Sequence, residues 1–224
     1  QNEHGAYLGA RWQPSRTWLL QGYVDYAHFS WPRYRVSTTS DAFDALLSGR
    51  HTRATWSIDG RYRLHIRQRD NSDKTRLVNS VEQRLRLGCS YTFAPQLTLR
   101  TQADAVNIGR EGTNKRGVMV SQQASWQYQW LHADAHVGWF CTDDYDSRLY
   151  QYERSVLYDY SFPMYYGRGL RYALMLRADI GTRWMVTAKV GVTNYFDRSV
   201  IGSSLQQVNA SSMTDLLLQL RYKI

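Results

Sequence analysis

The strongest constraint on the fold of this chain is a period of two. It ends TDLLLQLRYKI, in which Leu216, Leu218, Leu220, Tyr222 and Ile224 share one parity and mostly polar residues share the other. Side chains of a β-strand alternate between its two faces, so this pattern predicts a strand with one apolar and one polar face. In a soluble protein the apolar face would meet a core, whereas in a membrane barrel it would meet lipid.

The same alternation recurs along the chain, in about eleven segments. Several run to 9 residues or more, which matches the roughly 9–11 residues that a tilted strand needs to cross a bilayer. Strands of soluble sheets usually have about five or six residues. A large soluble sandwich or barrel remains the alternative. The expected strands are 6–12, 18–26, 43–49, 53–67, 81–93, 97–105, 118–128, 131–139, 170–180, 184–192 and 214–224.

The chain is basic, with 28 Lys and Arg against 19 Asp and Glu and a net charge of +9. A basic, aromatic-rich chain could bind nucleic acid, but that would require the charge and the stacking rings on one surface. Here the basic residues follow the polar parity and the aromatic residues follow the other, so no nucleic-acid partner is expected. The polar parity is expected to face a wet interior. The expected lumen-facing basic residues are Arg53, Arg61, Arg63, Arg67, Arg84, Arg86, Arg100, Arg171, Arg177, Lys189 and Arg221.

Short connections are expected at 13–16, 50–52, 94–96, 130 and 181–183, and aromatic residues on the apolar parity flank four of these five. Rings on the outside of a barrel at one rim form an aromatic girdle at the membrane interface. The other connections, expected at 30–41, 69–75, 108–116, 142–168 and 196–212, are long and polar. Short periplasmic turns and long outer loops are typical of outer-membrane barrels. The expected interface aromatics are Trp12, Trp18, Tyr91, Phe93, Trp126, Trp130, Trp184 and Tyr222.

The sequence therefore predicts an all-β fold, a transmembrane antiparallel up-and-down β-barrel, with 1–224 as one domain. An odd number of strands conflicts with the even number usual in single-chain bacterial barrels. Either 142–168 hides a twelfth strand, or the 224 residues are the C-terminal portion of a longer chain that forms a larger barrel. We favour the second interpretation.

Three stretches, FSWPRYRVS, YTFAPQLTLRTQ and YQYERSVLYDYSFPMYYGRGLRYALMLR, resemble the barrel region of outer-membrane proteins from Bacteroidota. More narrowly, they resemble the barrels of proteins that carry helix-hairpin-helix motifs in their N-terminal part. The resemblance covers most of the chain as a pattern, and the Tyr-rich stretch is its most specific part. It implies a bacterial outer-membrane location and assigns no role to individual residues.

Few residues suggest bond-making chemistry. His132, Asp134 and His136 lie at alternate positions of one expected strand and could bind zinc, although three polar residues obeying the alternation explain them equally simply. Ser, His and Asp occur without the spacing of a catalytic triad, so no enzyme and no cofactor are expected. Cys89 and Cys141 are too few for a disulfide framework.

Two functions remain open. The chain could form a channel or a transport- or secretion-associated pore for anions, or a non-conducting scaffold of a larger envelope complex. The segment 142–168 holds seven of the 17 tyrosines and could bind a partner, fold inward as a constriction or cap its own barrel. The expected partners are the lipid bilayer, lipopolysaccharide and, through the long loops, other envelope proteins.

Overall fold

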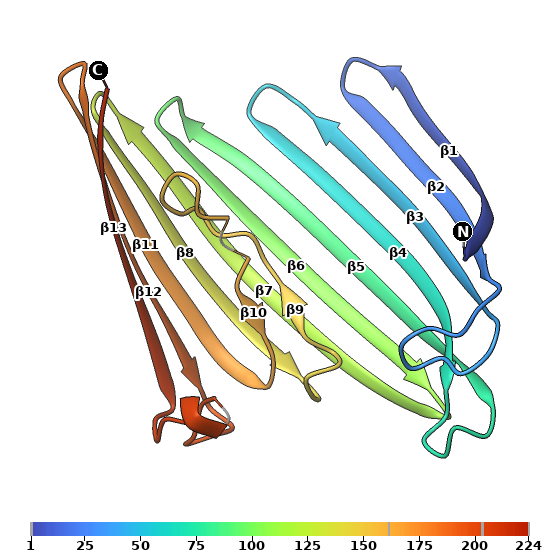
Figure 1. Ribbon diagram of the computed structural model, residues 1–224. Coiled ribbons are helices and arrows are strands. Elements are labelled where there is room, and N and C mark those ends of the chain that lie inside the picture. Colours follow the sequence, from blue (N-terminus) through green and yellow to red (C-terminus); the bar gives the residue numbers. More distant parts are fainter. Residues whose placement is uncertain (1, 161, 203, 224) are drawn as a thin grey trace.

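The computed structural model describes residues 2–160, 162–202 and 204–223. Eleven long strands form one antiparallel sheet in which each strand pairs with its neighbours in the chain, apart from an insertion between β8 and β11 (Figure 1). This confirms the all-β, up-and-down prediction and its eleven strands. The strands are β1 (Glu3–Ser15), β2 (Trp18–Phe29), β3 (Ser40–Thr52), β4 (Trp56–Asp70), β5 (Leu77–Ala94), β6 (Leu97–Arg110), β7 (Thr113–Tyr128), β8 (Leu131–Thr142), β11 (Arg168–Ile180), β12 (Trp184–Tyr195) and β13 (Ser212–Tyr222).

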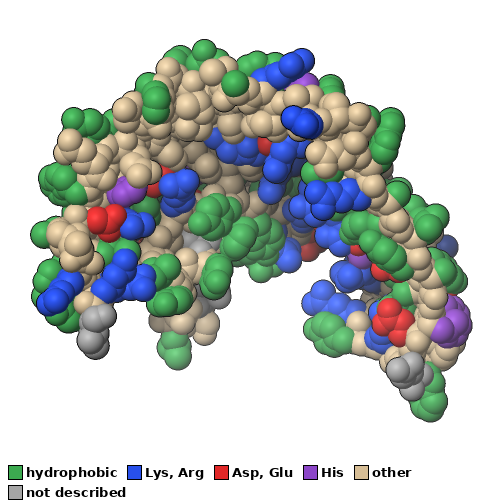
Figure 2. Space-filling view, turned by 90° about the horizontal axis from the view of Figure 1, so that it is seen from above, with side chains coloured by type: hydrophobic (Ala, Val, Ile, Leu, Met, Phe, Trp, Pro, Cys, Tyr) green, Lys and Arg blue, Asp and Glu red, His purple; other side chains and the backbone are tan. Residues whose placement is uncertain are grey.

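The sheet is bent into an arch whose two faces differ in chemistry. Lys, Arg, Asp and Glu side chains line the inside of the arch, and apolar side chains cover much of the outside (Figure 2). The alternation of each strand produces this separation, because one parity of every strand faces the concave side. On β13, for example, Leu216 and Leu218 are 74% and 76% exposed on the convex side, while Asp215 contacts Arg171 on the concave side.

The sheet is open in the described residues and does not close into a barrel on its own. Closure requires the first and last strands to pair through backbone hydrogen bonds. In the described part of the chain β1 pairs only with β2, and β13 only with β12. The two edge strands stand on opposite sides of the sheet (Figure 1).

Short turns lie at one end of the sheet and most of the long connections start from the other (Figure 1). We call these the short-turn end and the long-loop end. The expected long loop at 108–116 is wrong, because β6 and β7 join through Glu111 and Gly112 alone. Both residues have positive φ, 49° and 79°, the conformation of a two-residue hairpin turn that matches the twist of its strands.

The segment 143–167, which we call the inner loop, adds no twelfth strand to the sheet in its described residues. Where the structure describes it, the loop contains the short strands β9 (Leu149–Tyr150) and β10 (Met164–Tyr165), which pair with each other in a separate sheet. The loop leaves from the long-loop end and turns back over the sheet in front of β6 and β7 (Figure 1). It therefore covers part of the concave face, which agrees with the expectation that it could fold inward.

The remaining connections contain little regular structure. A single turn of 3-10 helix, η1 (Ser204–Gln206), lies between β12 and β13. Among the described residues, no helix has the length and apolar character needed to cross a membrane.

Candidate functional site

The predicted basic residues gather on the concave face, with one exception. Arg53 lies in the turn between β3 and β4, because β4 begins at Trp56 and not at residue 53 as expected. There its Nε donates a hydrogen bond to Nε2 of His51 at 3.3 Å. The others share the concave parity of their strands: Arg61, Arg63, Arg67, Arg84, Arg86, Arg100, Arg171, Arg177, Lys189 and Arg221.

Four of these arginines form two directly opposed pairs on adjacent strands. The register of β4 and β5 places Arg61 opposite Arg86 and Arg63 opposite Arg84. Like charges directly opposite each other destabilise a sheet.

Acidic neighbours compensate some of this charge. Arg63 contacts Asp44, and Arg84 Nε lies 2.5 Å from Glu82 Oε1. The remaining contacts are Arg86 with Asp104 and Arg100 with Asp59. Within the described residues, Arg61 forms no ion pair, so a positive excess remains.

The excess faces two adjoining cavities. The larger, about 400 Å³, lies between β2 and β6, and the smaller, about 150 Å³, lies between β4, β5, β6 and the inner loop. The smaller is bordered by Leu149 and Tyr150 of the inner loop. The basic residues lining the two cavities are Arg50, Arg61, Arg63, Arg84, Arg86 and Arg100. We call this set the arginine ladder.

Towards the long-loop end a third cavity, of about 550 Å³, continues the basic lining. It shares Arg84 with the smaller cavity. Its acidic lining residues are Glu82, Glu111 and Asp146. The three cavities therefore form a basic path along β4, β5 and β6. The basic residues lining the third cavity are Arg35, Arg69, Arg84, Arg110, Lys115 and Arg148.

The other half of the concave face is occupied by the inner loop, which is anchored there by a buried carboxylate. Glu153 has a side chain that is 1% exposed and accepts two hydrogen bonds from Arg171, of 2.9 and 2.8 Å. Lys189 Nζ lies 3.3 Å from Glu153 Oε2, and the hydroxyl of Tyr165 donates to Oε1 at 2.6 Å. Arg171 also donates to Asp215 of β13 at 2.6 Å, so the network joins the loop to three strands.

The environment of Glu153 keeps its carboxylate charged. Burial by itself would raise its pKa, but the hydrogen bonds donated by Arg171 and Tyr165 and the surrounding positive charge lower that pKa to about 2. Burial and the adjacent carboxylate raise the pKa of Tyr165, which therefore stays a hydrogen-bond donor.

A small apolar core lies beside this network. Phe140, which is fully buried, has its ring 5.2 Å from that of Tyr165 and 6.0 Å from that of Tyr195. The inner loop therefore packs on the concave face through both an apolar cluster and a buried ion-pair network. The cluster consists of Val106, Met119, Phe140, Leu149, Tyr165 and Tyr195.

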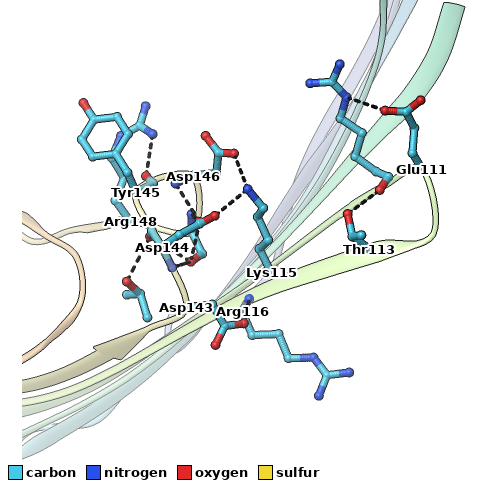
Figure 3. Close-up of polar contacts among 12 residues, drawn as sticks. Glu111, Thr113, Lys115, Arg116, Asp143, Asp144, Tyr145, Asp146 and Arg148 are labelled. Carbon is cyan, nitrogen blue, oxygen red and sulfur yellow. Dashed lines mark hydrogen bonds and ion pairs between the residues drawn. The ribbon is translucent and has the colours of Figure 1, made fainter. Parts of the chain in front are cut away.

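Polar contacts fix the root of the inner loop to the start of β7 (Figure 3). Lys115 Nζ lies 2.5 Å from Asp144 Oδ2 and 2.9 Å from Asp146 Oδ2. The backbone NH of Arg116 donates to Asp143 at 2.7 Å. The ion pairs of Lys115 are partly exposed and stabilise the root weakly, by about 0–1 kcal/mol.

The predicted interface aromatics are exposed, and they lie in or beside the short turns. Contacts join neighbouring members of the set: the ring centroids of Trp184 and Tyr222 are 4.7 Å apart, and those of Tyr91 and Phe93 4.5 Å. The predicted set is Trp12, Trp18, Tyr91, Phe93, Trp126, Trp130, Trp184 and Tyr222.

The weak zinc candidates do not converge. His132 Nε2 lies 3.3 Å from Asp179 Oδ2, and Asp134 accepts a hydrogen bond from Ser125 at 2.6 Å. His136 Nε2 lies 3.8 Å from Glu153 Oε1. No group of three or more His, Cys, Asp or Glu side chains within the described ranges could hold a metal ion. Cys89 and Cys141 are free thiols.

Sequence reasoning missed several residues of this face. Arg50 shares the concave parity of β3 but lay one residue beyond the expected strand. Glu153 was missed because the inner loop has no alternation that could indicate where a side chain points. On the convex face, Trp56 was omitted from the aromatic set because its strand was expected to start earlier.

Comparison with known proteins assigns no family. No family model matches the chain, and no curated protein matches its sequence.

Proposed function

We propose that this chain forms part of the wall of an outer-membrane β-barrel and that its arginine ladder lines an aqueous path for anions. The observation that carries the proposal is the separation of chemistry between the two faces of the sheet (Figure 2). A sheet with an apolar convex face and a charged concave face suits lipid outside and water inside. The exposed aromatics near the short turns suit a membrane interface.

The open edges of β1 and β13 are part of the proposal. Unpaired backbone groups at a sheet edge cost several kcal/mol each in hydrocarbon, so a membrane sheet needs both edges paired. We propose that further strands close the arch into a larger barrel. The resemblance to Bacteroidota outer-membrane barrels supports the same location, with the lipid bilayer and lipopolysaccharide as neighbours. No catalytic step is assigned to the chain.

A non-conducting scaffold is the second candidate, and the inner loop favours it. The loop packs its own apolar cluster and a buried ion-pair network against β7, β8, β11 and β12. Such a loop can fill an interior and leave no continuous path. The arginine ladder favours conduction, because the inner loop borders the cavities along β4 to β6 but does not fill them.

Conductance in a planar bilayer separates the two candidates. The full native chain, extracted in detergent and reconstituted, is expected to give channels whose reversal potential across a salt gradient shows preference for anions. Changing both Arg61 and Arg84 to Glu is expected to weaken that preference. Cation selectivity would refute the anion path, and stable insertion without any conductance would favour the scaffold. A monodisperse folded protein in detergent-free buffer would refute the membrane location.

A further inference from the structure

We infer that the 400 Å³ cavity of the arginine ladder is a binding site for a compact oxyanion with at least two negative charges, such as a phosphate or pyrophosphate group. The inference deepens the proposed function, because it names a class of solute for the path, and it rests on the proposal that the concave face meets water.

The lining is strongly unbalanced in charge. Arg50, Arg61, Arg86 and Arg100 line the cavity together with one carboxylate, Asp59. Asp104 compensates Arg86 from the adjoining cavity, and Asp59 compensates Arg100. Within the described part of the chain, neither Arg50 nor Arg61 forms an ion pair. The site therefore carries about two uncompensated positive charges, which a doubly charged anion would neutralise.

The donors suit an oxyanion. A guanidinium presents several N–H groups in a planar fork that matches the oxygens of phosphate and carboxylate groups. Ser48, Gln21 and Gln102 add neutral polar groups to the lining. A cavity of about 400 Å³ falls within the size range of small-ligand sites.

The site is also built on a rigid support. Arg100 is held by Asp59 through two hydrogen bonds, of 2.8 and 3.0 Å, and by Ser90 at 3.1 Å. This pair sits over Gly88: a Cβ at that position would meet Arg100 Nη2 and would lie 2.8 Å from Asp59 Oδ2. Arg86 is fixed by Asp104 and by the carbonyl of Tyr150, to which its Nη2 donates at 3.2 Å. Two of the four guanidinium groups are thus positioned before any ligand enters.

Arg61 is the centre of the site. It lines both adjoining cavities, lies opposite Arg86 in register and forms no ion pair within the described residues. An anion placed between Arg61 and Arg86 would relieve the repulsion of this pair. A bound anion would therefore stabilise the sheet at one of its two directly opposed arginine pairs.

The test is calorimetric titration of inorganic pyrophosphate into the folded native chain in zwitterionic detergent at low ionic strength. Wild-type protein is expected to bind, and the double variant Arg61→Gln with Arg86→Gln to bind at least ~10-fold more weakly. The matched control is Arg177→Gln with Arg221→Gln. It also removes one arginine with an ion pair and one that has none among the described residues; both lie on the concave face away from the cavity. This variant should bind within about twofold of wild type.

Each outcome decides the inference. Arg61→Lys with Arg86→Lys keeps the charge and the fold but loses the fork, and is expected to bind with intermediate affinity. Absence of pyrophosphate binding by folded wild-type protein, or equal weakening in the two Gln double variants, would overturn the site. Binding without conductance would retain the site and remove the channel. Anion-selective conductance without pyrophosphate binding would remove the site and retain the channel.

Discussion

Glu153 of the inner loop and Arg171 of β11 form a two-pronged ion pair, with Arg171 Nε 2.9 Å from Oε1 and Nη2 2.8 Å from Oε2. Both side chains are almost fully buried, at 1% and 3% exposure. Because both charges are removed from water, the loss of either partner would leave the other charge buried and uncompensated, which is strongly destabilising. This ion pair joins the loop to the sheet.

Glu153→Gln is expected to loosen the inner loop. The substitution leaves Arg171 and Lys189 buried without their shared carboxylate, which should lower the free energy of unfolding by about 3–5 kcal/mol. Limited proteolysis in detergent should then cleave within 143–167 faster. The control is Lys115→Gln, which breaks the exposed pairs at the loop root and should cost less than about 1 kcal/mol. Equal effects of the two variants would contradict the assignment of Glu153 as the anchor.

The same carboxylate predicts a pH dependence. Its pKa is lowered from 4.5 to about 2, so its stabilisation is fully present above pH 4.5 and is lost as the pH falls towards 2. The shift corresponds to about 3 kcal/mol. The stability difference between wild type and Glu153→Gln, measured by denaturant unfolding from pH 6 to pH 2, should therefore shrink over that window. A stability difference that stays constant, or that shrinks as the pH rises, would contradict the ionised Glu153 carboxylate as its origin.

Two neighbouring leucines of β3 test the assignment of the faces. Leu47 is 65% exposed on the convex side, whereas Leu46 lies opposite Arg63 on the concave side. Leu47→Arg would place a charge in lipid at a cost of about 2–4 kcal/mol and should reduce the folded protein recovered from membranes at least tenfold. Leu46→Arg places the same charge on the concave side, facing water. The folded Leu46→Arg protein should therefore be recovered from membranes in much higher yield than the Leu47→Arg protein. If both variants insert equally well, the convex face does not meet lipid.

Gly88→Ala tests the support of the arginine ladder. The added Cβ would lie against the Arg100–Asp59 pair and displace it, which should lower stability by about 1–2 kcal/mol. Gly60→Ala is the comparison, because its Cβ would meet only Leu87, at an ordinary 3.5 Å, and should be neutral or slightly stabilising. Thermal unfolding of both variants measures the difference. If Gly88→Ala leaves the stability unchanged, the Arg100–Asp59 pair does not depend on the absence of a side chain at position 88.

The sequence by itself determined the strands and their faces. Alternation has the period of the strand, so it specifies which side chains share a face before any pairing is known. The eleven strands and the concave side for Arg61, Arg84 and Arg171 follow from it. It also indicated a short-turn end with exposed rings such as Trp184, because turns interrupt the pattern. Strand ends were less certain, and Arg50 and Arg53 were each misplaced by a boundary error of a few residues.

Only the tertiary structure decided where the inner loop goes and whether the sheet closes. Glu153 reaches Arg171 and Lys189 because β11 and β12 lie under the loop, a contact between segments without any shared period. The two-residue turn at Glu111 depends on a backbone conformation that its flanking residues do not reveal. Closure depends on whether β1 and β13 come within hydrogen-bonding reach, which is a property of the curvature of the whole sheet. Local alternation fixes faces, and only the assembled sheet fixes curvature and long-range contacts.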